Sequence, residues 1–304
     1  MDNVKFGIIG LGRMGSAIAQ RVAAGGYEVL GFDPKSSQWP ELQTAGIKQC
    51  VSIHSLAQEA TIIWLMVPAG KIVDEVIETV LAGAKPHTIL IEGGNSYYVD
   101  SMRRAIVLSE KNINYLDCGV SGGIHGFKNG FCLMIGGVKK IYEQALPVLQ
   151  TIAAPHGCGY MGPSGAGHYV KMIHNGIEYG MLQSYAEGFH LLREGTFKHL
   201  DLKNIAQVWQ QGSVIRSWLL ELAYEVFAQD QFLKTIGGKI EEGGTGAWTV
   251  QTAHENKIPV PLIEKSLEVR KWSRHTGGNF ATKFIQMLRN AFGGHPIEIY
   301  KDEQ

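Results

Sequence analysis

The stretch Val4-Lys-Phe-Gly-Ile-Ile-Gly10-Leu-Gly-Arg-Met-Gly15 decides the fold of the N-terminal half of the chain. A short apolar run leads directly into a G-x-G-x-x-G motif, and a helical pattern follows from Ser16. Glycines between a strand and a helix permit a tight turn, and the amino end of the helix attracts a pyrophosphate. We therefore predict a dinucleotide-binding turn formed by Gly10, Leu11, Gly12, Arg13, Met14 and Gly15. A purely structural glycine turn is the less favoured interpretation.

Asp33 stands at the end of the second predicted strand, 27–32. A carboxylate at this point accepts hydrogen bonds from the adenosine ribose hydroxyls and repels a 2′-phosphate, so the sequence favours NAD over NADP. Lys35, two residues further on, leaves NADP open as the weaker alternative.

Strand and helix patterns then alternate, with further strands expected at 61–67 and 88–91 and a helix at 71–81. This alternation is typical of a doubly wound, mostly parallel sheet, whose ligands bind at the carboxyl ends of the strands. Asn95 follows one of these strands and could hydrogen-bond the nicotinamide ribose or a substrate hydroxyl, although it could equally cap the next helix. The other expected cofactor contacts are Met66, Val67 and Pro68.

The segment 119–126 is rich in glycine, and we predict that it is a loop. Its amide groups and the Ser121 hydroxyl would form a cradle for a carboxylate, with Gly122 and Gly123 as the neighbouring amides. A further strand at 131–137 and the segment 157–162 complete the first domain. The predicted fold is α/β: an N-terminal doubly wound Rossmann domain, 1–163, followed by an all-α C-terminal domain, 164–304.

The helix expected after Gly167 carries a reactive stripe. At about 100° per residue, its four polar side chains fall inside an arc of roughly 100°. They supply a proton acceptor, a proton donor and two orienting groups without a metal. An ordinary solvated face is the alternative, but Gly176 and Gly180 are poor helix formers that a merely exposed helix has no reason to carry. The stripe consists of Lys171, His174, Asn175 and Glu178, and the expected core side consists of Val170, Ile173 and Ile177.

Composition narrows the class of partner. The 304 residues include 28 basic and 28 acidic ones, so no electrostatic footprint for nucleic acid or an anionic membrane is present. No apolar run is long enough to span a bilayer and no secretory leader is visible, so we expect a cytoplasmic protein that acts on a small molecule. The four cysteines lack C-x-x-C spacing, so neither a zinc site nor a redox dithiol is predicted.

Six motifs occur in order along the chain: GLGRMG, GGNS, VSGG, KMIHNGIEYG, GGTGAWT and RNAFGGH. Together they resemble the decarboxylating 6-phosphogluconate dehydrogenases, and the length is similar to the short bacterial form, which is often linked to NAD. VSGG is shared with the wider β-hydroxyacid dehydrogenases, whereas HNGIEYG and FGGH are typical of the phosphogluconate branch. The resemblance covers almost the whole chain.

The resemblance implies roles for the polar stripe. Lys171 would take the proton from the carbon-3 hydroxyl as hydride leaves, and Glu178 would protonate carbon 1 after carbon dioxide is lost. These roles require a neutral amine and a neutral acid, and burial disfavours both charged forms. Ser121, Gly122 and Gly123 would hold the substrate carboxylate. The substrate hydroxyls would contact Asn95, His174 and Asn175.

The phosphate end departs from the family pattern, because basic residues usual in relatives are replaced by Gly243 and Ala247. The remaining expected contacts are Tyr179, Thr245, Arg270, Arg289 and His295. In relatives the last two come from the neighbouring subunit, which implies a homodimer or homotetramer. Arginine can still hold phosphate strongly because its donors match two oxygens at once.

Two other functions stay open at this point. The first is an NAD(P)-dependent dehydrogenase or reductase of a small, unphosphorylated β-hydroxyacid, which would not need Glu178, Arg270, Arg289 or His295. The second is a non-catalytic NAD-binding scaffold, for which Lys171 would be dispensable. The resemblance also leaves open whether the pathway is oxidative pentose phosphate metabolism or gluconate utilisation.

Overall fold

The computed structural model describes residues 4–35, 37–241 and 243–300. The chain forms two compact units, Met1–Met172 and Ile173–Gln304. They divide inside the long helix α8 (Ala166–Glu194), later than the boundary expected at residue 163. The start of α8 belongs to the first unit because it lies against the sheet: a Cβ added at Gly167 would be 2.4 Å from the Met134 carbonyl oxygen.

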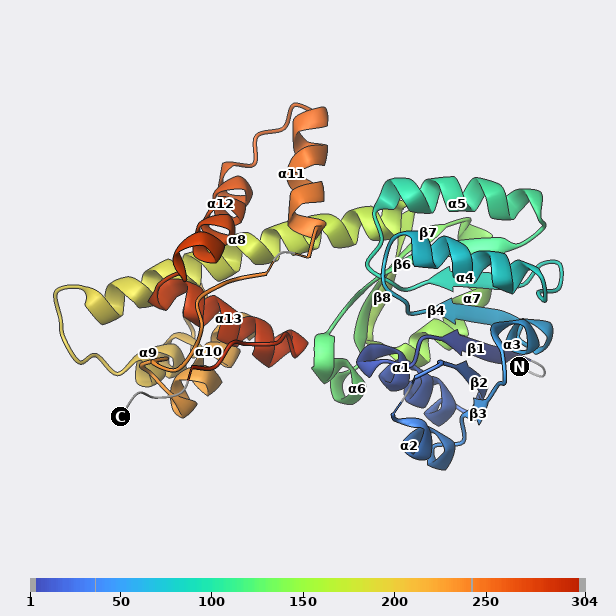
Figure 1. Ribbon diagram of the computed structural model, residues 1–304, viewed down its shortest axis with the longest axis horizontal. Helices are drawn as coiled ribbons and strands as arrows, with labels where there is room; N and C mark the ends of the chain where they lie inside the picture. The colour runs from blue at the N-terminus through green and yellow to red at the C-terminus, as the bar shows by residue number, and fades with distance from the viewer. Residues whose placement is uncertain (1–3, 36, 242, 301–304) are drawn as a thin grey trace. The chain divides into compact units, whose positions relative to one another are not determined.

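The first unit is built on one sheet of eight strands in the order β3-β2-β1-β4-β5-β6-β7-β8 (Figure 1). All neighbouring strands are parallel except β6 and β7. The order reverses between β1 and β4, which is where sheets of this type bind ligands. The predicted doubly wound sheet is confirmed. The strands are β1 (Lys5–Ile9), β2 (Glu28–Phe32), β3 (Lys48–Gln49), β4 (Ile62–Leu65), β5 (Ile89–Glu92), β6 (Asn114–Ser121), β7 (Phe131–Gly137) and β8 (Ala153–Gly162).

Helices cover both faces of this sheet, and each face has its own hydrophobic cluster between the strands and the helices. One cluster takes Ile18 from α1 and Leu149 from α7, and the other takes Leu56 from α3, Val73 from α4 and Leu108 from α5. Buried apolar strands between two helical layers explain why the strands read as continuous hydrophobic runs. The helices are α1 (Arg13–Ala24), α2 (Trp39–Thr44), α3 (Ile53–Glu59), α4 (Lys71–Leu81), α5 (Tyr98–Glu110), α6 (Gly126–Asn129) and α7 (Lys139–Ile152).

The second unit is helical, as the sequence predicted. Its core is an aromatic cluster in which the ring of Phe227 lies 4.9 Å from that of Phe189 and 4.7 Å from that of Phe284, centroid to centroid. Besides the remainder of α8, its helices are α9 (Leu202–Trp209), α10 (Trp218–Gln229), α11 (Thr245–Glu255), α12 (Pro261–Thr276) and α13 (Phe280–Gly293).

The packing of α8 differs in part from the expectation. Ile177 was expected to face the core but is 55% exposed. The buried side of the helix is rotated because α11 and α12 approach it at its glycines. A Cβ at Gly176 would lie 2.8 Å from Thr249, and one at Gly180 would lie 3.3 Å from Leu262. The two glycines therefore have a packing role that the expected wheel did not include.

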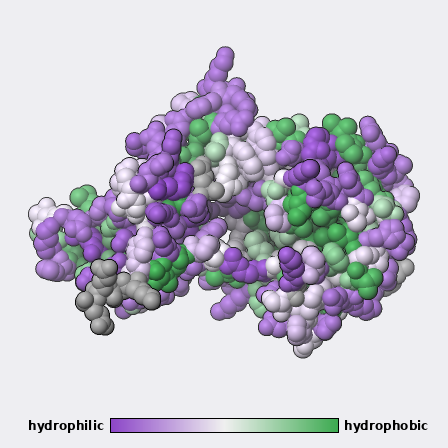
Figure 2. Space-filling model, in the orientation of Figure 1, coloured by the Kyte–Doolittle hydropathy of each residue, from purple (hydrophilic) through white to green (hydrophobic). Residues whose placement is uncertain are grey.

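Hydrophobic side chains gather over part of the visible surface of the first unit, between hydrophilic ones (Figure 2). Helix α5 contributes Val99, Met102 and Ile106, all of them exposed. Among the residues that the structure describes, no helix has both the length and the apolar content that crossing a membrane requires.

Candidate active site

The glycine-rich turn connects β1 to α1 and packs tightly on one side only. Gly10 has φ +94°, and a Cβ there would lie 2.4 Å from the Met66 carbonyl oxygen. A Cβ at Gly15 would lie 1.9 Å from the Gly10 carbonyl oxygen. By contrast, nothing lies within 4 Å of a Cβ added at Gly12, which caps α1 without a side-chain hydrogen bond. The turn therefore leaves an exposed helix N-terminus with no acidic residue in its first turn, which suits a pyrophosphate.

Asp33 fixes this turn from the next strand. Its Oδ2 accepts the backbone N–H of Leu11 at 2.7 Å, and its Oδ1 accepts that of Lys35 at 2.8 Å. A carboxylate has about four acceptor positions, and these two hydrogen bonds use two of them. Asp33 thus holds the loop and can also contact a cofactor, a double role that the sequence did not reveal.

The loops after β4 and β5 lie beside the turn. Met66 packs against Gly10 so closely that a Cβ on this glycine would meet its carbonyl oxygen. In the same way, a Cβ on Gly94 would lie 2.9 Å from the Val67 carbonyl oxygen. Pro68 and Asn95 are exposed. Helix α5 is capped at Tyr97 without a side-chain hydrogen bond, so Asn95 does not have the capping role that was its structural alternative.

A buried ion pair underlies the loop that carries Asn95. Glu92 is fully buried, and Arg104 donates to its two oxygens at 3.0 and 3.2 Å. The hydroxyls of Ser96 and Tyr115 also donate to Glu92. Burial and the negative charge of Glu92 raise the pKa of Tyr115 well above its ordinary value. The sequence analysis did not identify this network.

Arg104 also binds Asp74 on α4, with its Nε donating at 2.8 Å. Arg103 donates to the same carboxylate at 3.0 Å, and the hydrogen bonds from both arginines lower the pKa of Asp74. One arginine therefore links α4, α5 and the end of β5 below the candidate site.

The segment expected to be a loop at 119–126 is more regular than predicted. Strand β6 runs through Ser121, and a 3-10 turn follows at Gly123–His125, so Gly122 is the one residue between them. The loop prediction was wrong for Gly119 because this glycine serves close helix packing and not a turn. Gly122 has φ +130° and Gly123 has φ +54°, a backbone that favours glycine.

Lys171 is held against β6 by the same glycine. A Cβ at Gly119 would lie 2.3 Å from the Cβ of Lys171, so a glycine is needed for α8 to approach this strand. Asp117, which is buried on β6, accepts the N–H groups of Gly165 at 2.6 Å and His168 at 2.9 Å. A strand carboxylate therefore caps the amino end of α8, and Lys171 is 9% exposed on its second turn.

The other members of the stripe belong to the second unit. His174 Nδ1 lies 3.1 Å from Asn175 Oδ1, and Asn175 Nδ2 donates to the Thr245 hydroxyl at 3.3 Å. His174, Asn175 and Glu178 are all partly exposed, whereas Thr245 is buried. The structure therefore joins the stripe to the first residue of α11.

Two arginines lie around the ring of Tyr179 in this unit. The guanidinium carbon of Arg270 is 3.3 Å from the ring centroid, and Arg270 is 2% exposed. Arg289 donates to Gln286 Oε1 at 2.6 Å. Burial lowers the pKa of Arg289, and the neighbouring Tyr179 and Glu178 oppose this shift. The structure thus groups Tyr179, Arg270 and Arg289, which are far apart in the sequence.

Arg289 lies in α13, in the same compact unit as Tyr179. His295 follows this helix, is exposed and packs against the Phe292 ring at 6.1 Å between centroids. A Cβ added at Gly243 would meet none of the described residues within 4 Å, in the place where relatives carry a basic side chain.

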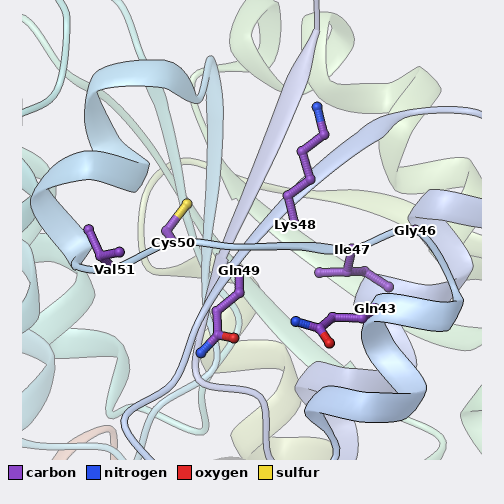
Figure 3. Close-up of a pocket in the computed structure, with 7 residues that line it drawn as sticks. All are labelled: Gln43, Gly46, Ile47, Lys48, Gln49, Cys50 and Val51. Carbon is purple, nitrogen blue, oxygen red and sulfur yellow. The ribbon is translucent and has the colours of Figure 1, made fainter.

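A hollow at the edge of the sheet involves none of the expected site residues. Figure 3 shows that Lys48 and Gln49, the two residues of β3, line this hollow and point to opposite sides of their strand. We assign it no chemical role. Its lining consists of Gln43, Gly46, Ile47, Lys48, Gln49, Cys50 and Val51.

Comparison with known proteins explains this arrangement. Residues 5–176 match the family described as the NAD binding domain of 6-phosphogluconate dehydrogenase, and residues 167–282 match its C-terminal domain. This chain belongs to the 6-phosphogluconate dehydrogenase family. The first unit is accordingly an NAD(P)-binding domain.

One relative matches over nearly its full length. The Haloferax volcanii protein named 6-phosphogluconate dehydrogenase, NAD(+)-dependent, decarboxylating, is 42% identical over 299 residues, which cover 97% of this chain and 98% of the relative. Among solved structures, 6-phosphogluconate dehydrogenase of Plasmodium falciparum matches with a TM-score of 0.82 and 29% identity over 89% of this chain and 62% of its own. A Mycobacterium tuberculosis 3-hydroxyisobutyrate dehydrogenase shares the fold, with a TM-score of 0.73 and 22% identity over 94% of this chain and 99% of its own.

Two groups of residues in this family member escaped the sequence analysis. Glu92 and Arg104 are twelve positions apart in the sequence, Glu92 on β5 and Arg104 on α5. Asp117 lies three residues before VSGG, and the sequence analysis gave it no role. A buried carboxylate directly before a glycine-rich motif is the one signal that could have pointed to it.

Proposed function

We propose that this chain oxidises and decarboxylates 6-phosphogluconate to ribulose 5-phosphate and carbon dioxide, with NAD as the preferred oxidant and NADP as a weaker one. The observation that supports this most directly is the seating of Lys171 on Gly119, two residues from the predicted carboxylate cradle at Ser121. Full-length similarity to the NAD(+)-dependent Haloferax protein supports the same activity.

NAD fits the residues present, because Gly12 is exposed, α1 has an exposed amino end and the carboxylate of Asp33 lies at the turn, where it accepts the N–H of Leu11. When bound, NAD would accept the hydride from carbon 3 of the substrate. Lys171 Nζ would take the proton of the carbon-3 hydroxyl and later return it to that oxygen. Because the carboxylate is then beta to a carbonyl, carbon dioxide leaves without a metal and an enediol remains. Glu178 would deliver a proton to carbon 1 of the enediol while Lys171 takes the proton back from the neighbouring hydroxyl, whose oxygen becomes the ketone of the product.

Different residues would contact the carboxylate, the hydroxyls and the phosphate of the substrate. The carboxylate would be held by Ser121, Gly122 and Gly123. The hydroxyls would contact Asn95, His174 and Asn175. The phosphate would lie against the group formed by Tyr179, Thr245, Arg270 and Arg289, with His295 as a further contact. A homodimer or homotetramer in the cytoplasm is part of the same proposal.

Initial-rate measurements test the activity. With 6-phosphogluconate and NAD we expect NADH and carbon dioxide in equal amounts, and a lower kcat/KM with NADP. NADH without carbon dioxide would contradict decarboxylation. Turnover with 3-hydroxyisobutyrate and none with 6-phosphogluconate would contradict the substrate.

Asp33→Ala should reduce the preference for NAD. Loss of a ribose acceptor and of the Leu11 anchor should lower kcat/KM for NAD by about tenfold, since hydrogen bonds to charged groups contribute about 1.5–3 kcal/mol. The value for NADP should fall less, because a repulsive charge is removed at the same time. Asp33→Asn is the matched control, as it keeps one acceptor oxygen. An unchanged NAD to NADP ratio would show that another residue makes the choice.

Arg289→Ala should raise the KM for 6-phosphogluconate by about 10- to 100-fold, because a charge-assisted contact to phosphate is lost. The KM for NAD should stay the same. Arg289→Lys should be intermediate, since it keeps the charge but not the planar fork. Arg193→Ala is the control: this arginine of the same unit stacks on Phe280, 4.4 Å from the ring centroid. Equal KM values for Arg289→Ala and wild type would remove Arg289 from the phosphate site.

A further inference from the structure

Four buried polar side chains form a continuous connection through the first unit. Tyr115 donates to Glu92, and a side-chain hydrogen bond with Ser101 opposes the rise in the pKa of Tyr115. The Ser101 hydroxyl in turn lies 2.7 Å from His168 Nδ1. None of the four is more than 5% exposed. We call Glu92, Tyr115, Ser101 and His168 the buried polar chain.

Each end of the buried polar chain is next to a residue of the proposed site. At the first end, Ser96 donates to Glu92 and directly follows Asn95. At the other end, His168 lies one helical turn before Lys171, and its backbone N–H is fixed by Asp117 at 2.9 Å. The connection thus runs from the loop after β5, through β6 and α5, to the first turn of α8.

Burial of polar groups costs free energy unless they are hydrogen-bonded, and apolar side chains of similar size would stabilise this core as well or better. What hydrogen bonds add is direction and distance. A misplacement of about 1 Å can cost about 100-fold in rate when reacting groups must meet in one geometry. A hydrogen-bonded connection between two loops that carry reacting groups is suited to holding that geometry.

We propose that the buried polar chain positions Lys171 relative to Asn95, so that Glu92, Tyr115, Ser101 and His168 are positioning residues for proton removal. This inference rests on the proposed function. None of the four touches the substrate. They act through the first turn of α8 and through the loop at 93–96.

The first test compares two variants that each remove one hydroxyl. Tyr115→Phe breaks the connection in its middle, whereas Tyr160→Phe removes a hydroxyl that donates to the Gly137 carbonyl oxygen at 2.9 Å, away from it. We expect Tyr115→Phe to lower kcat by about tenfold or more. Its Kd for NAD should not change, and Tyr160→Phe should keep wild-type kcat. Equal kcat values for the two variants would overturn the proposal.

A second test uses rescue at His168. An asparagine can place a hydrogen-bonding atom close to the position of the histidine Nδ1, whereas alanine cannot. His168→Ala should therefore lower kcat by about 100-fold, and His168→Asn should recover most of it. Combined with Tyr115→Phe, the His168→Ala effect on kcat should be less than multiplicative. Independent effects, or no recovery with asparagine, would contradict a connected chain.

A measurement without substrate separates this inference from the proposed function. Hydrogen exchange of the whole protein should be faster in Tyr115→Phe at amides 166–172 and 93–97, and unchanged there in Tyr160→Phe. If the wild type showed no activity on 6-phosphogluconate, the proposed function would fail. The hydrogen-exchange comparison of the two variants would still test whether the buried polar chain connects the two segments. Unchanged exchange in Tyr115→Phe at both segments would sink the inference even in an active enzyme.

Discussion

Lys171→Met should lower kcat with 6-phosphogluconate by about 10³-fold or more while leaving the Kd for NAD within about twofold of wild type. Methionine has a similar length and no basic nitrogen, and its Cβ can occupy the same contact with Gly119. Lys171 is only 9% exposed, so a neutral thioether costs little there. Steady-state rates give kcat, and displacement of fluorescent NADH by NAD gives the Kd for NAD.

The matched control is Lys140→Met, the same change at an exposed position of α7. It should keep both kcat and the Kd for NAD. Loss of NAD affinity in Lys171→Met, in parallel with activity, would mean that the lysine supports the domain and not the chemistry. A kcat equal to that of Lys140→Met would remove Lys171 from the mechanism.

Local patterns in the sequence were sufficient for the elements that depend on neighbours along the chain. The helix expected at 71–81 is α4, Lys71–Leu81, because its apolar residues repeat with the helical period. The glycine turn was predicted because strand, glycines and helix follow each other directly. In both cases the information lies within one short window.

Features that depend on distant packing could not be predicted in this way. The helical wheel treated Ile177 as core, but its exposure is decided by α11 and α12, which approach α8 at Gly176 and Gly180. Gly119 was read as part of a loop because a glycine that admits a helix looks the same in sequence as one that permits a turn. Contacts between elements far apart in the chain determine which reading is right.

The same argument applies to the candidate site. The resemblance located the stripe and the phosphate residues, but not the polar groups behind them. Arg104 lies on an amphipathic helix and would ordinarily be solvated, yet it is 2% exposed. Its partner Glu92 becomes recognisable only when β5 and α5 are placed together.

Arg104→Ala should be among the most destabilising substitutions in the first unit, with a loss of about 3–5 kcal/mol in the free energy of unfolding. Removal of the guanidinium leaves the carboxylate of Glu92 fully buried without a cation. It also removes the donor to the Gly70 carbonyl oxygen at 3.1 Å and leaves Asp74 with Arg103 alone of its two arginines. Urea unfolding followed by circular dichroism measures the loss. Arg103→Ala is the control, because its side chain is 52% exposed and exposed pairs contribute about 0–1 kcal/mol.

Glu92→Gln combined with Arg104→Met should recover much of this stability, because no unpaired charge then remains in the core.

Arg104 also makes the free energy of unfolding depend on pH in the acid range. Since its hydrogen bond lowers the pKa of Asp74 in the folded state, this pair stabilises the protein at neutral pH and the contribution is lost as the pH falls through that lowered pKa. Arg104→Ala should therefore lose less stability on acidification than the wild type does. If Arg104→Ala and Arg103→Ala unfolded at the same urea concentration, the buried ion pair between Arg104 and Glu92 would not contribute the expected stability to the first unit.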